Sequence, residues 1–339
     1  PIAIAVSTQL TGSIEISRTE NKIGKALLLG VAYSASIGGM ATLIGTPTNI
    51  ILASIIKEIY HYEITFNQWM LFGLPISIVF LLLTWYYLTY FAYKLDENQS
   101  VQAGKQEIDN QLRAIGPMTV EEKRVGIVFG LVSLAWITRS EYLQQFFPAL
   151  DDTMIALSGV LLLFLSPSST PKTKLLDWKT AEKIPWGILL LFGGGLSLAE
   201  GFSATGLAEW IGHQFVFLDF IAFGLFLLII IISVNFLTEI TSNMATASML
   251  LSILAAISYS MDVHPFGLMV GATMASSCAF MLPVATPPNA VVFGSGYLEM
   301  KDMIKAGFWL NIISIIIITI TTRYYLPNIW NIDLLKYPF

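Results

Sequence analysis

The stretch ATPPN, residues 285–289, places two consecutive prolines inside an apolar region long enough to cross a membrane. A near copy, GTPTN, lies 240 residues earlier at 45–49, again in apolar surroundings. Proline lacks a backbone N–H and its ring clashes with the preceding helical turn, so each motif predicts an interrupted helix. Because the interruption occurs twice in matching surroundings, it indicates a repeated structural feature.

Composition predicts an all-α membrane protein that crosses the bilayer several times. Hydrophobic residues make up 55% of the 339 residues and charged residues 12%, with a mean hydropathy of +0.69. A soluble domain has about a quarter of its residues charged, so this sequence is too apolar for that class. The net charge of −5 is small and dispersed, and we expect no nucleic-acid partner. The single cysteine excludes an internal disulfide, and the three scattered histidines predict no metal cluster.

Apolar runs of spanning length, or close to it, are the candidate membrane segments: 26–56, 68–93, 125–138, 153–166, 185–199, 219–239, 244–259, 266–296 and 306–326. The most polar stretch, 96–124, mixes both charge signs and predicts a solvated linker between two halves. The chain begins at Pro1 without a methionine or a signal peptide, and we expect that preceding residues have been cut away.

Basic residues predict the topology, because lysine and arginine are retained on the cytoplasmic side. Fourteen of the eighteen fall in four loops that are therefore expected inside: 9–25, 94–124, 167–184 and 297–305. Loops 209–218 and 258–266 contain none, so both are expected outside. The two apolar pieces between them then form a hairpin that enters from outside and turns within the membrane. Two full crossings joined by an inside turn at 240–243 are the alternative.

The tip of this hairpin reads TEITSNMAT, residues 238–246. Ser242 and Asn243 are favourable N-cap residues, and their side-chain oxygens are predicted to accept hydrogen bonds from the first amides of a helix starting at Met244. Such a helix start would place a partial positive charge at membrane depth. Ordinary spans with polar residues packed between helices remain the alternative.

Segments 26–56 and 266–296 would each be about 46 Å long as one helix, well beyond a hydrocarbon core of about 30 Å. Each is therefore predicted to be two half-helices. In both motifs a threonine precedes a proline, the N-cap and first-turn arrangement that starts a helix, at Thr46 with Pro47 and at Thr286 with Pro287. A break at depth is tolerated where its free amides face an anion and its unwound carbonyls hold a cation. A simple packing kink is the alternative for either proline.

The two breaks match in sequence at an offset of 240 residues. SASIGGMATLIGTPTN (34–49) aligns with MASSCAFMLPVATPPN (274–289), and on the predicted topology the two segments run in opposite directions. An inverted repeat with discontinuous helices points to a secondary transporter, with its site between the halves. At the same offset, the partner of the hairpin tip would fall near residues 2–6, which offer nothing polar. The first tip, and with it the N-terminal part of the first repeat, is therefore expected before Pro1.

The motifs TSNMAT (241–246), GTPTN (45–49) and SSCAFMLPVATPPNAVV (276–292) together resemble the divalent anion:sodium symporter family, over essentially all 339 residues. The resemblance implies sodium-coupled transport of a dicarboxylate, citrate or sulfate. It also implies a homodimer in a lipid bilayer, with a scaffold domain and a mobile transport domain in each protomer and an elevator-type alternating-access mechanism. A bacterial inner membrane is the expected location.

Site residues follow from the same resemblance. The anion is expected at Thr46, Pro47, Ser242, Asn243, Met244, Thr286 and Pro287. Gly45 is expected at one sodium site, and the other is expected at Thr238, Thr241, Asn243 and Ala285. Met244 stands where the family usually has threonine, which removes one hydroxyl and leaves the preferred anion open. The first tip motif is expected before Pro1, so the first sodium site is expected to be incomplete in this sequence.

The resemblance also implies a division of the chain. Residues 1–93 and 216–326 are expected to be the transport-domain parts of the first and second repeats. Residues 94–215 are expected to hold the cytoplasmic linker and the scaffold helices, and 327–339 a C-terminal tail.

None of the expected site residues is a lysine or arginine, so a dianion would depend on hydroxyls, an amide, helix N-termini and bound sodium ions. Bound sodium then supplies the missing positive charge, which gives a reason for coupling. Glu239 is the one acid near the tip, and it would serve either a cation or proton, or neighbouring amides. A sodium-independent anion exchanger, a proton-coupled antiporter and an ion channel remain alternatives. No Ser/His or paired Asp arrangement appears within the spans, so we expect no enzyme.

Overall fold

A computed structural model describes residue 3 and residues 22–94, 108–110, 112–170, 173–184, 186–207, 210 and 222–339. Throughout these ranges the regular structure is helical, apart from one isolated β-bridge between Pro167 and Lys174. Four helical segments in the described part are long and apolar enough to cross a membrane: Phe66–Ala92, Phe223–Ile240, Asn243–Ser260 and Met300–Trp330. The expectation of an all-α membrane protein is confirmed.

The α-helices follow one another along the chain as α2 (Lys22–Gly39), α3 (Pro47–Tyr60), α4 (Phe66–Tyr86), α6 (Val120–Thr138), α7 (Gln144–Phe146), α8 (Asp152–Leu165), α9 (Trp178–Ala181), α10 (Trp186–Ala204), α12 (Phe223–Ile240), α13 (Asn243–Ser260), α14 (Pro265–Ser276), α15 (Pro287–Phe293), α16 (Met300–Ile320) and α17 (Leu326–Trp330). Three π-helical turns extend helices at their C-terminal ends: η2 (Tyr87–Ala92), η3 (Arg139–Leu143) and η5 (Thr321–Tyr325).

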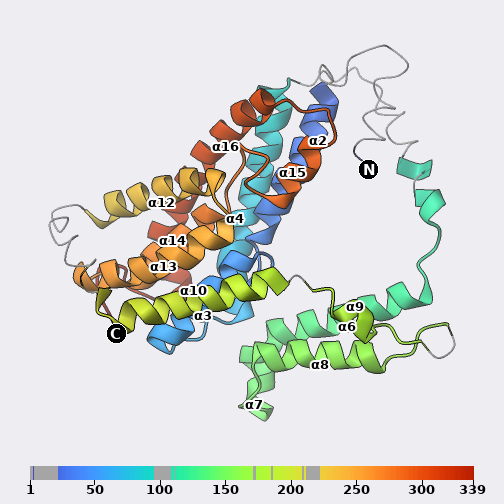
Figure 1. Ribbon diagram of the computed structural model, residues 1–339, viewed down its shortest axis with the longest axis horizontal. Coiled ribbons are helices and arrows are strands. Elements are labelled where there is room, and N and C mark those ends of the chain that lie inside the picture. The colour runs from blue at the N-terminus through green and yellow to red at the C-terminus, as the bar shows by residue number, and fades with distance from the viewer. Residues whose placement is uncertain are drawn as a thin grey trace.

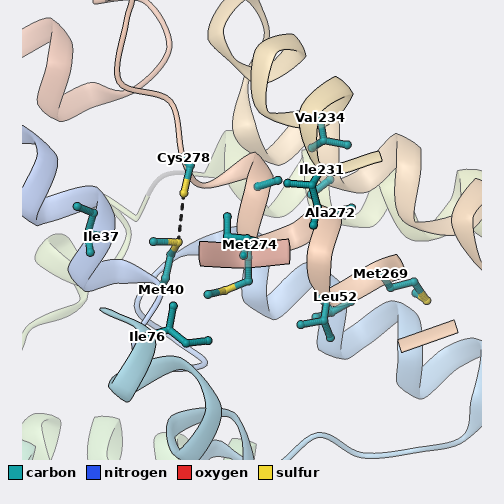
Figure 2. Close-up of a cluster of buried hydrophobic side chains, with 14 of the residues drawn as sticks. Ile37, Met40, Leu52, Ile76, Ile231, Val234, Met269, Ala272, Met274 and Cys278 are labelled. Carbon is teal, nitrogen blue, oxygen red and sulfur yellow. Dashed lines mark hydrogen bonds between the residues drawn. The ribbon is translucent and has the colours of Figure 1, made fainter. Parts of the chain in front are cut away.

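Helix α14 lies at the centre of the main body, and all twelve of its residues are buried. Helices α12, α13, α3 and α16 contact it, while α6, α7, α8 and α9 form a smaller group to one side (Figure 1). Figure 2 shows that the core draws side chains from both halves of the chain, with Met40 and Cys278 meeting at its middle. Their sulfur atoms are 3.7 Å apart. The two broken segments therefore share one hydrophobic core.

Both predicted interruptions are present. Helix α2 ends at Gly39 and α3 begins at Pro47, while α14 ends at Ser276 and α15 begins at Pro287. Helices α12 and α13 are joined through Thr241 and Ser242 alone. Helices α4 and α16, which follow the two breaks, each have 21 residues and each continue into a π-helical turn.

The predicted linker 96–124 is wrong in its C-terminal part. Residues 112–115 are helical, and α6 already begins at Val120. A capping box starts α6, because Thr119 accepts from the Glu122 amide while the Glu122 carboxylate accepts from the Thr119 amide. Residues 95–107 of the linker, loop residues 211–221 and nearly all of residues 1–21 lie outside the described part of the chain.

A buried arginine joins the α6–α8 group to the main body. Arg139 is 1% exposed, and its Nη1 donates to Glu63 Oε1 over 2.8 Å. Its Nε lies 3.1 Å from Asp152 Oδ1, and Asp152 Oδ2 accepts from the Phe66 amide over 3.2 Å. The Phe66 ring stacks on Trp136. A guanidinium is tolerated in such a place only when carboxylates compensate it, so this joint depends on both acids.

Candidate binding site at the helix breaks

Oxygen atoms converge where the hairpin tip meets the end of α14. Thr238 Oγ1 lies 2.6 Å from Asn243 Oδ1 and 3.0 Å from the carbonyl oxygen of Ser276. The hydroxyl has one hydrogen for these two acceptors, so the cluster is rich in lone pairs and poor in donors. Two of the expected sodium ligands, Thr238 and Asn243, are thus together. The Ser276 carbonyl belongs to the same cluster and was missed, because backbone oxygens carry no residue-type signal.

The capping prediction at the tip is wrong in two respects. Helix α13 begins at Asn243 rather than Met244, and the Ser242 side chain makes no cap hydrogen bond although Ser242 occupies the N-cap position. Asn243 does not cap either, because its oxygen accepts from the Thr238 hydroxyl. The first amides of α13 therefore have no cap from these two side chains.

The remaining tip residues are held locally. The Thr241 hydroxyl donates to the Leu237 carbonyl over 2.9 Å and lies 2.6 Å from Thr246 Oγ1. Met244 is half-buried and packs against the hydrophobic core. The tip therefore presents Ser242, which is exposed, beside the half-buried Asn243.

At the first break, Thr46 is the N-cap residue of α3 and Pro47 follows at the first helical position, as expected. The Thr46 side chain makes no cap hydrogen bond, so that part of the prediction is wrong. Its hydroxyl instead lies 3.3 Å from Thr48 Oγ1, which is 2.8 Å from Ser277 Oγ. Ser277 comes directly after Ser276, whose carbonyl oxygen belongs to the cluster at the tip. These three hydroxyls therefore connect the first break to the second.

Gly45 has no room for a side chain. A Cβ there would lie 2.9 Å from Thr42 Oγ1 and would overlap the carbonyl oxygen of Gly39. Gly45 is exposed, so its backbone is open to a ligand while its α-carbon faces the turn. The expected ligand role of Gly45 agrees with this placement but is not tested by it.

The second break follows the local prediction more closely. Thr286 accepts a hydrogen bond from the Asn289 amide over 3.3 Å and so caps α15, with Pro287 at the first helical position. Thr286 and Ala285 are buried, whereas Pro287 is exposed. The second N-terminus thus has a cap from its own threonine, and the first does not.

Two asparagines hold the unwound segments in the same way. Asn49 Nδ2 donates to the Thr42 carbonyl over 2.9 Å, with the Gly39 carbonyl 3.5 Å away. Asn289 Nδ2 donates to the carbonyls of Leu282 and Ala279, each over 3.1 Å. These two residues lie 240 positions after Thr42 and Gly39. In the described part of the chain, the Oδ1 atom of each asparagine is buried without a hydrogen-bond partner. The sequence alignment paired these asparagines, but it did not reveal that they shape the breaks.

Glu239 serves amides, which was one of its two predicted roles. Its carboxylate accepts from the backbone amides of Phe280, Met281 and Leu282 over 2.7, 3.0 and 3.0 Å, and from Asn311 Nδ2 over 2.8 Å. The side chain is buried, with Glu239 only 3% exposed. Four hydrogen-bond donors compensate the negative charge of Glu239. By binding three consecutive backbone amides, this carboxylate holds the unwound segment before Ala285 in place.

Glycines on the following helices let the breaks approach closely. A Cβ at Gly307 of α16 would overlap the Phe280 carbonyl, and one at Gly73 of α4 would lie 2.5 Å from the Met40 carbonyl oxygen. Phe280 follows Met40 by 240 residues, whereas Gly307 follows Gly73 by 234. The contact is therefore the same in both halves, with a shorter connection in the second.

The residues expected to bind the anion and the sodium ions include no charged side chain. Hydroxyls, an amide oxygen and backbone carbonyls are ligands that suit a hard alkali cation, and half-helix N-termini suit an anion. Both kinds of group lie at the two breaks and the tip. The geometry therefore agrees with simultaneous binding of a cation and an anion.

Comparison with known proteins identifies the family. The model described as the sodium:sulfate symporter transmembrane region matches residues 1–331. The chain is 45% identical over 317 residues to the sodium-dependent dicarboxylate transporter SdcS of Staphylococcus saprophyticus, covering 92% of this chain and 61% of that relative. It is 43% identical over 341 residues to SdcS of Staphylococcus aureus strain USA300, covering 98% of this chain and 65% of the relative. The chain thus spans less than two-thirds of these relatives, and it belongs to the divalent anion:sodium symporter family that its motifs resemble.

Proposed function

We propose that this chain forms the main part of a sodium-coupled symporter for a divalent anion, with a dicarboxylate as the substrate. The observation that carries the proposal is the oxygen cluster of Thr238, Asn243 and Ser276 beside the uncapped start of α13. A cation and an anion bound there would be neighbours. The printed function of the relatives, sodium-dependent dicarboxylate transport, supports the same substrate pair.

Sodium would bind at the oxygen cluster. The Asn243 and Thr238 side chains and a backbone carbonyl supply neutral oxygens, to which the remaining expected ligands, Thr241 and Ala285, would add theirs. A second sodium ion would bind near Gly45 at the first break. Neutral oxygens favour a weakly held, exchangeable cation, as a transport cycle requires.

The anion would bind at Ser242 and Asn243 of the tip and at Thr46 and Pro47 of the first break. Neither helix start is capped by its own N-cap side chain, so backbone amides remain for a carboxylate. Thr286 and Pro287 would line the site at the second break. They would leave fewer free backbone amides for the anion, because Thr286 already caps α15.

Coupling follows from charge. Because the site contains no lysine or arginine, a dianion bound alone would be compensated only by dipoles and hydroxyls. Each sodium ion placed a few ångströms away removes part of this cost, so anion affinity rises with sodium concentration. By linkage, the anion raises sodium affinity by the same factor.

We further infer an inverted repeat, a hairpin that turns within the membrane, and a homodimer with elevator-type movement in a bacterial inner membrane. The matching asparagine and glycine contacts of the two halves support the repeat. The α6–α8 group, attached through Arg139, is the candidate scaffold, and the helices around α14 are the candidate transport domain.

Uptake of radiolabelled succinate into proteoliposomes tests the proposal, using full-length protein with and without an inward sodium gradient. We expect saturable uptake that requires sodium. Uptake driven instead by an outward proton gradient or by an internal counter-anion would replace the symporter with an antiporter or exchanger. Sodium-independent, non-saturating flux would indicate a channel.

A further inference from the structure

A pocket of about 860 Å³ lies between the start of α2, the end of α4 with its η2 turn, and the first half of α16. It is separate from the proposed transport site, since none of the tip or break residues lines it. Its lining combines lysines with exposed aromatic and aliphatic side chains. Such a mixture is unusual for a surface facing only water or only hydrocarbon, and it points to an amphipathic ligand.

The polar end of the pocket is basic. Lys22, Lys25 and Lys305 line it together with one acid, Asp302. Lys25 Nζ pairs with Asp302 Oδ2 over 2.7 Å, and both residues are largely buried, so this pair mainly joins α2 to α16. Lys22 and Lys305 are exposed and form no ion pair with any described residue. Two positive charges are therefore available to one anionic group.

The apolar wall begins next to these lysines and continues along two helices. Leu83 of α4 and Trp309 of α16 are 40% and 54% exposed, and Ile313 lies one turn beyond Trp309. Lys305 and Ile313 are eight residues apart on α16, which is about 12 Å along the helix axis. Both helices belong to candidate membrane spans. The wall therefore leads from a charged end into the hydrocarbon region.

Basic residues predict the side of the membrane on which this pocket opens. Loops 9–25 and 297–305, which carry Lys22 and Lys305, are expected on the cytoplasmic side. Anionic lipids of that leaflet are attracted to basic groups at helix ends, and basic pockets between spans on this side bind lipid head groups. We propose that the pocket binds an anionic phospholipid, with its phosphate at Lys22 and Lys305 and an acyl chain along Trp309 and Ile313.

Native mass spectrometry of the full-length protein tests the head-group part. Phosphatidylglycerol and phosphatidylcholine with identical chains are added to wild type, to Lys22→Gln/Lys305→Gln, and to the control Lys301→Gln. Lys301 lies on the same helix, is exposed and pairs with Glu299, but it does not line the pocket. We expect bound phosphatidylglycerol to fall roughly 30-fold in the double variant, since each surface lysine near anionic lipid contributes about fivefold. The control should bind as wild type does.

Three outcomes would overturn the proposal. Equal binding of both lipids would remove the anionic requirement, and unchanged binding by the double variant would place the lipid elsewhere. Glycerol phosphate competing as well as the lipid would show that the site takes a free anion. Because Lys22 and Lys305 are exposed, both substitutions should leave the fold intact, and the single variant Lys305→Gln provides an intermediate.

Fluorescence tests the acyl-chain part. Phosphatidylglycerol brominated on its chains should quench Trp309, and the quenched fraction should drop in Trp309→Phe. In the double lysine variant, quenching should fall to the level seen with Trp309→Phe. Quenching that stays at the wild-type level in the lysine variant would contradict a lipid held by its phosphate in this pocket.

Discussion

Asn243 is the residue on which both halves of the proposed site depend. Its oxygen belongs to the cation cluster, and its backbone amide lies at the start of α13. Asn243→Ala should therefore abolish sodium-driven uptake in proteoliposomes while the elution profile in size-exclusion chromatography stays that of the wild type. Asn328→Ala, at an exposed asparagine of α17, is the matched control and should transport normally. Near-normal transport by Asn243→Ala would remove this residue from the site.

The family resemblance places Met244 where a threonine is expected. If its side chain borders the anion, methionine withdraws one hydroxyl donor, and a hydrogen bond to a charged group is worth about 1.5–3 kcal/mol, or roughly 10- to 150-fold in affinity. Met244→Thr should raise the affinity for C4 dicarboxylates most, relative to citrate and sulfate, in competition assays against labelled succinate.

The control for that variant is Met249→Thr, on the same helix at a side chain that is 56% exposed. It should leave the ranking of the three anions unchanged. The same unchanged ranking in Met244→Thr would mean that the half-buried methionine contributes only to packing, and the argument about substrate choice would fail.

At the scale of elements, the two breaks differ in how open they are. Cysteine placed at 46 or 286, with Cys278 replaced by alanine, should react with a small aqueous thiol reagent and be protected by substrate plus sodium. Position 46 should react faster, because Thr46 is half-buried whereas Thr286 is only 6% exposed. Cysteine at position 48, which is fully buried, is the inert control. Inertness at both positions in every transport state would indicate that the prolines are simple packing kinks.

Local chemistry explains which elements were predictable. In both motifs a threonine followed by proline is the arrangement that starts a helix, so both breaks and both helix starts followed from sequence. Hydropathy likewise located the spans within a few residues of their ends. The linker prediction failed where a capping box at Thr119 with Glu122 started α6, a signal that the mixed charges concealed.

Two kinds of hydrogen bond explain what was not predictable at the site: local bonds between side chains that replace capping, and bonds between distant parts of the chain. The oxygen of Asn243 is taken by Thr238 and the hydroxyl of Thr46 lies beside Thr48, so neither caps its helix. Glu239 finds its amides about forty residues away at Phe280 to Leu282. Pairings over such separations depend on how helices pack, and a single sequence does not specify them.

At the scale of the whole molecule, the C-terminal tail closes one end of the core around His264. The His264 amide donates to the Leu334 carbonyl over 3.1 Å, and its ring packs edge-on against Phe266 and Phe339. Burial lowers the pKa of His264 from an ordinary 6.5 to about 4, although the nearby Asp333 acts in the opposite direction. Its Nδ1 accepts from the Phe266 amide, which requires the neutral ring.

Stability should therefore depend on pH in a definite direction. The unfolded chain takes up a proton at His264 below pH 6.5, whereas the folded protein does so only near pH 4. The contribution of the neutral His264 to the free energy of unfolding is therefore complete above pH 6.5 and is lost as the pH falls from 6.5 to 4. The melting temperature, followed by circular dichroism in detergent, should drop between pH 7 and 4. His264→Asn, which keeps an N-cap acceptor, should show a smaller drop. An identical pH profile for the two proteins would contradict a buried neutral histidine.

The unequal spacing of the two halves shows where the chain tolerates a change of length. Each half is held at two points, the asparagine after the break and the glycine on the next long helix, and the distance between these points is six residues shorter in the second half. The difference lies in α15, which has 7 residues where α3 has 14. The two halves thus differ in length between the two held points. An epitope or fluorescent tag placed at 294–299 would lie between the two held points, outside the contacts of both. One placed at 277–286 would separate amides and carbonyls that Glu239 and Asn289 hold together.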